Sequence, residues 1–490
     1  MKNIELQLNN NLIFRLVLIF IIIIGIILRL NVYLYNQGFW GDEAMIAYNL
    51  LERNNYFDFF LPLNHYQVAP PFFLIISKIF FEIGKLTGSI YYTVMMARFI
   101  PFIASVLSIP LFCKLLNKAF NNKTLIIIAL SMLSFNKAAI NYAQELKQYS
   151  TELLFTIILL TAFYSIDLKK DSTLKTVCYA VLFCISPWCS FSSLFILAAG
   201  FVLIFRKRNQ CKKNFLILIV PFMLNLILFY IFYKYTCVFQ YPYMQTFWKD
   251  YFMPNWQGEF LIEQTHLLLS FFNNGCLYLI FPIIGFMVLF YKKHHKILFL
   301  SFFSLFACIF LSILRHYPYS LRLILFLLPI FCIIYSSPVL IIKENKVLFH
   351  TVILLSIIIA LLRIKVPVSN YIIHLNDAMR HIAIIKQDKE PVLSIISNQA
   401  ALFEYAHKTF KEKYDIQVKG ITCDKNYVKQ FQTHTKQGGI YYFSSPVSSF
   451  EEAGCISEIK KMLSTDNFEI LKEYEYPYDS LIYLIKFKVK

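Results

Sequence analysis

The stretch Gly38-Phe-Trp-Gly-Asp-Glu-Ala-Met-Ile-Ala-Tyr-Asn-Leu-Leu-Glu-Arg53 directly follows the first long apolar run of the chain. It therefore places two adjacent carboxylates, Asp42 and Glu43, where a membrane helix leaves the bilayer. Apolar residues recur at helical spacing after the pair, so Asp42 occupies the position of a helix N-cap. The dipole of that helix favours carboxylates at its start, which is a purely structural explanation for the pair. The alternative is that the pair performs chemistry at the membrane surface.

The composition indicates a polytopic membrane protein. Of the 490 residues, 58% are hydrophobic and only 16% are charged, whereas soluble domains have roughly 45–50% apolar and about 25% charged residues. There are 47 Lys plus Arg against 29 Asp plus Glu, a net charge of +18. Membrane proteins concentrate Lys and Arg in cytoplasmic loops. Because the chain has no zinc-finger spacing, basic-aromatic repeat or glycine-rich phosphate loop, we expect no nucleic-acid partner.

The basic clusters predict the topology. A retained first membrane helix is expected at about residues 12–34, with Lys2 and Arg15 on the cytoplasmic side. Further basic clusters begin at Lys114, Lys169, Arg206, Lys292 and Lys343. Apolar spans are expected at 93–116, 124–140, 150–166, 174–190, 191–205, 214–237, 275–291, 297–314, 320–340 and 347–362. The 20-residue rule thus predicts roughly eleven spans, within a range of about 11–13 membrane helices.

Residues 70–84 form a short apolar run interrupted by Lys78. Alternating crossings favour a tilted or re-entrant helix in the outer leaflet, and the alternative is a full crossing with an extra pass elsewhere. The loops at 35–69, 141–149, 238–274 and 315–319 then lie outside. Residues 1–366 constitute the predicted transmembrane domain, with 35–69 as its first outer loop.

After Pro367 the sequence becomes polar and alternates short β-rich runs with helical ones. Strands are predicted at 392–397, 416–421, 440–444, 468–474 and 481–489, and helices at 399–410 and 451–463. This alternation indicates a small α/β domain over 367–490. It contains no glycine-rich nucleotide fingerprint, so we assign it no cofactor. We expect it to lie outside and to cap the outer face of the site.

Four short motifs resemble, in order, the GT-C superfamily of membrane glycosyltransferases, near the protein O-mannosyltransferase (family 39) and aminoarabinose transferase type. They are Asp42-Glu43, Gln67-Val-Ala-Pro-Pro71, Ala97-Arg98 and Tyr142-Ala-Gln-Glu-Leu-Lys-Gln-Tyr149. The resemblance covers about residues 1–160 by motif. It implies a GT-C fold, an Asp-Glu pair in the first extracytoplasmic loop, and a polyprenyl-phosphate sugar donor. Ala69 stands where family members usually carry a polar residue, which argues against a protein-mannosyltransferase activity.

Sugar transfer from such a donor requires a base, cations that hold the lipid phosphate, and an apolar groove for the prenyl chain. We expect Asp42 to be the general base that deprotonates the acceptor hydroxyl. Glu43 is the second choice for this role, and alternatively contacts a sugar hydroxyl or a metal ion. A single displacement with one base predicts inversion at the anomeric carbon.

Two arginines near the outer ends of spans are candidates for holding the donor phosphate. Arg98 begins its span, and its guanidinium fork suits phosphate; snorkelling to the interface is the alternative. Arg29 lies near the outer end of the first span. We expect it to form a salt bridge with a loop carboxylate, for example Asp42 or Glu43.

Two further clusters lie in outer loops. The resemblance places Glu145, Lys147 and Tyr149 beside the first loop, and we expect Glu145 or Lys147 to contact the donor phosphate or sugar. The alternative is an exposed charge pair at a helix end. The third cluster faces the lipid phosphate in similar enzymes and comprises Arg315, His316, Tyr317, Tyr319 and Arg322. Arg322 is predicted just inside the next span.

These observations predict an enzyme, a multi-pass glycosyltransferase of the inner (plasma) membrane with an extracytoplasmic C-terminal domain. Its donor would be a polyprenyl-phosphate sugar, and its acceptor a lipid or a cell-surface glycan. His65 and His266 are isolated histidines, so we assign no metal and leave a divalent cation as an open alternative. The competing functions are a transporter or flippase of lipid-linked or small solutes, and a non-catalytic envelope-assembly subunit. Charges at the outer ends of spans favour the enzyme over the transporter.

Overall fold

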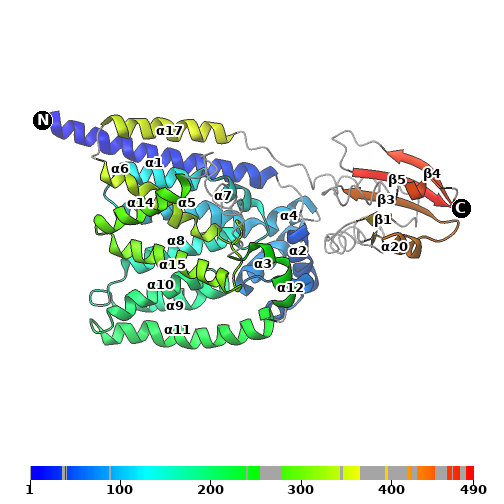
Figure 1. Cartoon of the computed structure of the whole chain (residues 1–490), viewed down its shortest axis with the longest axis horizontal. Helices are drawn as coiled ribbons and strands as arrows, with labels where there is room; N and C mark the ends of the chain where they lie inside the picture. The colour runs from blue at the N-terminus through cyan, green and yellow to red at the C-terminus, as the bar shows by residue number, and fades with distance from the viewer. Residues whose placement is uncertain are drawn as a thin grey trace. The chain divides into compact units, whose positions relative to one another are not determined.

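The computed structural model describes residues 2–35, 39, 41–87, 90–238, 241–253, 277–342, 346–364, 392–395, 418–421, 427–446, 459, 461–465, 467–474 and 482–490. The chain divides into two compact units (Figure 1). The first, which we call the helical unit, comprises Met1–Leu34, Phe57–Ile79 and Arg98–Val366. The second, which we call the mixed unit, comprises Tyr35–Tyr56, Phe80–Ala97 and Pro367–Lys490. Each unit is described by itself below.

Long helices that run side by side form most of the helical unit (Figure 1). The helices with residues in this unit, long and short, are α1 (Lys2–Tyr35), α3 (Pro71–Leu86), α5 (Phe99–Ala119), α6 (Lys123–Ser134), α7 (Lys137–Asn141), α8 (Tyr149–Ser165), α9 (Thr173–Cys189), α10 (Ser193–Arg206), α11 (Lys212–Phe232), α12 (Tyr241–Phe247), α14 (Leu277–Tyr291), α15 (His295–Ile313), α16 (Leu328–Ser336) and α17 (Lys346–Ile364). Short 3-10 or π turns join them at Tyr56–Phe60, Asn64–Tyr66, Tyr142–Gln144, Tyr233–Cys237, Lys249–Tyr251, Leu325–Leu327 and Ser337–Ile341.

The helices confirm a multi-pass membrane protein. Among the described residues, four are long and apolar enough to cross a membrane: Asn11–Tyr35, Phe99–Ala119, Lys212–Cys237 and His295–Ile313. The pair α6 and α7, bent by 49°, makes a fifth if it is one span. The other predicted spans correspond to apolar helices of 10–17 residues, which are shorter than the roughly 20 residues we expected of a span. Helix α3 has 16 residues, about 24 Å, which is also short of the bilayer core.

Two predicted spans are interrupted. The span predicted at 93–116 is divided at Arg98 into α4 (Ile90–Ala97) and α5. Pro101 explains the division, because its ring would clash with the Ala97 carbonyl of a continuous helix, whereas proline is tolerated in a first turn. The span predicted at 124–140 breaks after Ser134. There Asn136 caps α7 by accepting a hydrogen bond from the Ala139 N–H at 3.0 Å.

The predicted span at 320–340 begins later than expected. Residues 321–324 form a turn, and the helical run starts at Leu325 with Pro329 in the first turn of α16. Arg322 therefore lies in the turn before this helix, and its predicted place inside the span is wrong.

The mixed unit contains a five-stranded sheet in the order β2-β1-β3-β5-β4. Its strands are β1 (Val392–Ile395), β2 (Val418–Ile421), β3 (Ile440–Pro446), β4 (Phe468–Tyr474) and β5 (Ile482–Val489). Strand β1 pairs in parallel with β2 and β3, while β5 pairs antiparallel with β3 and β4. Helix α20 (Tyr427–His434) follows β2 and contributes Phe431 to the core of this sheet. The alternation confirms the predicted α/β fold class.

The helices of the α/β region differ in part from the prediction. Sequence reasoning did not anticipate α20, whose polar composition gives it little apolar signal. The helix predicted at 399–410 lies outside the described residues, as does most of the one at 451–463. Residues 41–52 of the first predicted loop form α2 (Gly41–Glu52), which also belongs to the mixed unit.

Candidate functional site

The carboxylate pair lies in the first turn of α2. The helix begins at Gly41, so Asp42 is inside the helix and is not its N-cap, contrary to prediction. The first N–H groups of a helix lack intrahelical partners, and both carboxylates are placed to benefit from them. Their exposure differs: the Glu43 side chain is fully buried, whereas Asp42 is half-buried. Of the two, Asp42 is the carboxylate with an exposed surface.

The second half of the first loop belongs to the helical unit and contacts other segments of that unit at three points. The Thr236 hydroxyl donates to the Phe60 carbonyl at 2.8 Å. Tyr66 stacks on Tyr243 with ring centroids 4.3 Å apart. The Lys147 ammonium donates to the Gln67 side-chain oxygen at 2.7 Å. This last contact confirms that the 142–149 segment lies beside the first loop, as the resemblance implied.

Lys147 is not part of an exposed charge pair. Its side chain is 6% exposed, and that of Tyr149 is 4% exposed, while Glu145 is half-buried. The ring of Tyr149 packs edge-on against that of Tyr142, with centroids 5.1 Å apart, so the two ends of the 142–149 segment contact each other. The predicted alternative of a solvated pair at a helix end is therefore wrong, because a buried ammonium requires polar partners to offset its desolvation.

Backbone strain accompanies the Gln67 contact. His65 and Tyr66 have φ values of 60° and 53°, a left-handed conformation that is unfavourable for side chains other than glycine. The Gln67 amide spans this turn by donating to the His65 carbonyl at 3.3 Å while it accepts from Lys147. Strained residues of this kind gather at ligand sites more often than elsewhere.

Arg98 occupies the junction between α4 and α5 as the N-cap residue of α5. Its side chain is 1% exposed. Snorkelling requires the side chain to run along the lipid-facing surface to water, so that alternative is wrong for Arg98. A buried guanidinium at the start of a span is a candidate for an anion contact.

Arg29 has a different environment from the one predicted. Its side chain is fully buried. The Nε–H donates to the Ser105 hydroxyl at 2.8 Å, and Nη1 donates to the Gly25 and Ser134 carbonyls at 2.9 and 2.8 Å. Nη2 donates to the Leu133 carbonyl at 3.3 Å. The guanidinium thus bonds to neutral oxygens, and the predicted salt bridge to a loop carboxylate is wrong.

The break between α6 and α7 explains these partners of Arg29. Leu133 and Ser134 end α6, and their carbonyls have no partner within that helix. A cation is favoured at the negative end of a helix dipole. The approach of α1 is close here, because a Cβ on Gly25 would lie 2.9 Å from Ile109 and 3.0 Å from Ser134. Arg29 therefore ties α1, α5 and α6 together at the point where the bent span breaks.

The third predicted cluster packs against the 241–253 segment. Arg315 is exposed and has φ 59°, the left-handed conformation of a residue that ends a helix, here α15. Its carbonyl accepts a hydrogen bond from the Gln245 amide. Arg322 lies over the Trp248 ring at 4.7 Å, a cation-π contact. The prediction treated residues 241–253 only as part of an outer loop, although their aromatic residues indicated a segment that packs against others.

Tyr317 connects this cluster to the interior. Its hydroxyl donates to the Leu323 carbonyl at 2.7 Å, and its ring packs against Phe195 at 5.0 Å. Burial raises the pKa of Tyr317 well above its ordinary value, so the hydroxyl keeps its proton and remains a donor.

Sequence reasoning overlooked Glu152. It lies on α8 with 3% of its side chain exposed. It also interacts electrostatically with Tyr317. A carboxylate within an apolar helix was the available signal, because such residues are rare and usually functional.

No group of three or more His, Cys, Asp or Glu side chains within the described part of the chain is arranged to hold a metal ion. His65 lies in the strained turn, and His266 is outside the described residues. The structure thus offers no ligand set to which a divalent cation can be assigned among these residues.

No protein-family model matches the sequence, and no curated protein is similar to it. Solved structures are similar in fold. ArnT from Cupriavidus metallidurans in the apo state matches with a TM-score of 0.50 at 11% identity, over 95% of this chain and 97% of that one. ArnT bound to undecaprenyl phosphate gives 0.46 at 11% identity, with the same shares covered. The Archaeoglobus fulgidus oligosaccharyltransferase in complex with zinc and sulfate gives 0.45 at 13%, over 95% and 72%.

The match to apo ArnT extends over nearly the whole of both chains. This chain therefore has a fold similar to that of ArnT. At 11% identity the similarity concerns the fold alone. Because one fold hosts different activities, the function has to be argued from the residues of the site.

Proposed function

We propose that this protein is a membrane glycosyltransferase that transfers a sugar from a polyprenyl-phosphate donor to a lipid or cell-surface glycan acceptor. The observation that carries the proposal is the 2.7 Å hydrogen bond from Lys147 to Gln67. It joins two loop motifs that are 80 residues apart in the sequence, and both belong to the resemblance with GT-C enzymes. The GT-C fold along almost the entire chain supports the same function.

In the proposed reaction Asp42 removes the proton from the acceptor hydroxyl. The acceptor oxygen forms a bond to the anomeric carbon as the bond from that carbon to the phosphate oxygen breaks. The electron pair of the broken bond leaves with the polyprenyl phosphate, and the configuration inverts. Asp42 is suited to this role because it is half-buried, whereas Glu43 is fully buried and is better placed to fix the start of α2.

Cations near the outer loops are proposed to stabilise the leaving phosphate. Arg98 and Lys147 are buried, and a charge outside water interacts more strongly with an anion than an exposed one does. Arg315 and Arg322 would contact the phosphate from the third cluster, and Glu145 and Tyr149 would orient the sugar. Arg29 is proposed to act through the α6–α7 break rather than on the donor, since its hydrogen bonds go to protein oxygens.

The arrangement in the membrane is part of the proposal. Residues 1–366 would form the transferase domain, and residues 367–490 an extracytoplasmic domain. The basic turns would face the cytoplasm, as the distribution of Lys and Arg predicts for a plasma-membrane protein.

The test is a transfer assay on the purified full chain in nanodiscs. Polyprenyl-phosphate sugars are supplied with extracted envelope lipids, and released polyprenyl phosphate is measured. Asp42→Asn should reduce the rate by at least about a hundredfold, in line with general-base contributions. Asp58→Asn is the matched control, because it removes a carboxylate from the same loop and should leave the rate near wild type. Donor binding without release of polyprenyl phosphate from any donor would favour a non-catalytic subunit instead.

A further inference from the structure

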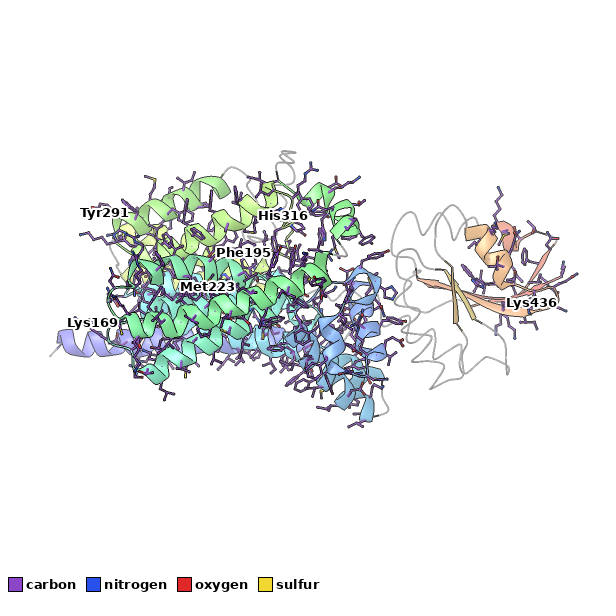
Figure 2. All side chains as sticks on the ribbon, turned by 90° about the horizontal axis from the view of Figure 1, so that it is seen from below. Lys169, Phe195, Met223, Tyr291, His316 and Lys436 are labelled. Atoms are coloured by element: carbon purple, nitrogen blue, oxygen red, sulfur yellow. The ribbon has the colours of Figure 1, made fainter. Side chains whose placement is uncertain are left out.

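An apolar groove lies between α10, α14 and α15 and has a volume of about 970 Å³. Its walls are mainly aromatic and aliphatic and include Leu203, Phe286, Phe290, Leu298, Phe299 and Phe302. Tyr291, which also lines it, lies with Lys169 toward one end of the helical unit, and His316 lies toward the other (Figure 2). The groove is thus at the end where the basic turns gather.

Positive charge is concentrated at one end of this groove. Arg206 is exposed, and its guanidinium makes no hydrogen bond or ion pair with any residue the structure describes. Lys296 is half-buried, and its ammonium donates to the Tyr164 carbonyl at 3.1 Å. Neither residues 200–213 nor residues 286–302 contain an Asp or a Glu. The segments that form this end therefore carry only positive charge.

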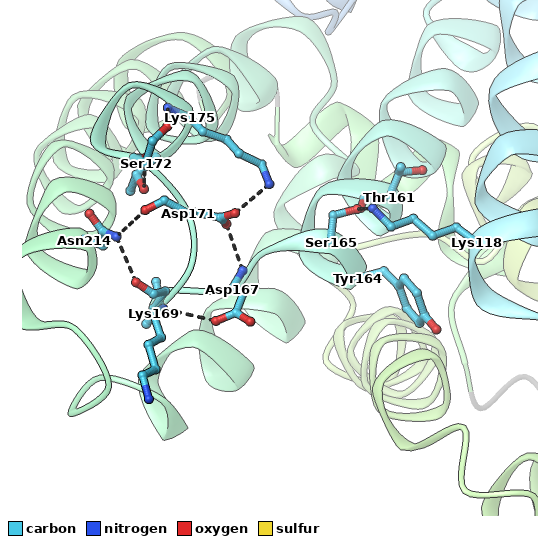
Figure 3. Close-up of polar contacts among 12 residues, drawn as sticks. Lys118, Thr161, Tyr164, Ser165, Asp167, Lys169, Asp171, Ser172, Lys175 and Asn214 are labelled. Atoms are coloured by element: carbon cyan, nitrogen blue, oxygen red, sulfur yellow. Dashed lines mark hydrogen bonds and ion pairs between the residues drawn. The ribbon is translucent and has the colours of Figure 1, made fainter.

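Two acidic residues of the turn between α8 and α9, Asp167 and Asp171, are already engaged (Figure 3). Asp171 accepts a hydrogen bond from the Lys175 ammonium at 2.6 Å and from the Asp167 N–H at 2.9 Å. Asp167 accepts from the Lys169 N–H at 3.1 Å. Asp167 also attracts Lys296, but Lys118 and Lys207 repel it, so a positive excess remains at the mouth of the groove.

We propose that this groove binds one anionic phospholipid of the surrounding bilayer. The phosphate would lie between Arg206 and Lys296, and the acyl chains along the aromatic walls. An arginine fork matches phosphate geometry, and basic pockets between membrane helices are known to accept anionic head groups. The predicted topology puts this end in the cytoplasmic leaflet, where anionic lipids are concentrated.

This site is distinct from the proposed donor site. Lys296 is in the first turn of α15, whereas Arg315 follows its other end. The 19 residues of α15 span about 28 Å, nearly the thickness of a bilayer core. A single phosphate cannot contact both residues, so the groove lipid is separate from the sugar donor.

The test is native mass spectrometry of the full chain in a neutral detergent, titrated with phosphatidylglycerol or phosphatidylcholine of the same acyl composition. We expect phosphatidylglycerol to bind at least about tenfold more tightly. Arg206→Gln should weaken its binding about fivefold, and Arg206→Gln with Lys296→Gln about 25-fold, the effect expected for roughly 1 kcal/mol per basic residue. Leu203→Trp should weaken both lipids by filling the groove.

The matched control is Lys169→Gln with Lys213→Gln, which removes two charges from the same end without touching the groove. It should leave the preference for phosphatidylglycerol intact. Lys296 has a hydrogen-bond partner inside the protein, so replacing Lys296 can perturb folding. The single Arg206→Gln variant therefore decides whether the groove binds the phosphate. Equal affinity for the two lipids, or an equal loss in the control variant, would overturn the proposal. So would displacement of phosphatidylglycerol by equimolar polyprenyl phosphate, which would make this a donor groove.

Discussion

Replacing Arg29 with Met tests whether this residue ties three helices together. Methionine keeps an unbranched apolar stem but removes every hydrogen-bond donor. The change leaves the Leu133 and Ser134 carbonyls without the guanidinium at the end of α6, and it also removes the bond to Ser105. An unsatisfied buried acceptor costs about 1–3 kcal/mol in a water-soluble protein, although bonds between membrane helices average only about 0.6 kcal/mol. We therefore expect a loss of about 2–4 kcal/mol.

Arg29→Lys should cost roughly half as much. Lysine keeps the charge at the helix end, but a single nitrogen cannot reach the oxygens that Nε, Nη1 and Nη2 contact in a fork. The assay is thermal unfolding of the purified protein in detergent, followed by tryptophan fluorescence, with denaturant titration for the free energy.

The matched control is Arg15→Met, which makes the same substitution on the same helix at an exposed position. It should change stability by less than about 0.5 kcal/mol. If Arg29→Met were as stable as Arg15→Met, or if Arg29→Lys were as damaging as Arg29→Met, the hydrogen bonds to the α6 carbonyls would not be what stabilises this junction.

Three further outcomes are expected. Lys147→Met should weaken binding of the polyprenyl-phosphate donor by about 1–3 kcal/mol, the range for charged hydrogen bonds. Lys137→Met, at an exposed position, is the control and should leave donor binding unchanged. Equal donor binding by the two variants would exclude Lys147 from the site. Arg98→Lys should weaken donor affinity and Arg98→Ala should weaken it more, and unchanged affinity in both would exclude a phosphate contact. Burial, together with the charge of the neighbouring His295, lowers the pKa of His294, so the fold favours its neutral form. Stability should be full above about pH 6.5 and fall as the pH drops through that value, and thermal scans of His294→Gln should show less of this decline.

Several features follow from the sequence alone because their causes are local. Long apolar runs predicted α8, α9 and α17 to within about two residues at each end, since a helix needs only its own backbone for hydrogen bonds. The alternation of strands and helices predicted the α/β fold class after residue 366. The charge balance and the acidic pair of α2 were also visible directly.

The partners of charged side chains were decided by the tertiary structure. Arg29 was predicted to pair with a carboxylate because unlike charges attract, yet its donors go to carbonyls exposed by a break in α6. The resemblance placed the 142–149 segment beside the first loop, but the bond from Lys147 to Gln67 was not predicted. Glu152 was missed, although a carboxylate within an apolar helix is visible in the sequence. Sequence spacing specifies which face of a helix a residue occupies, but a buried charge bonds to whichever oxygens neighbouring helices bring within about 3 Å, and that depends on how all of them pack.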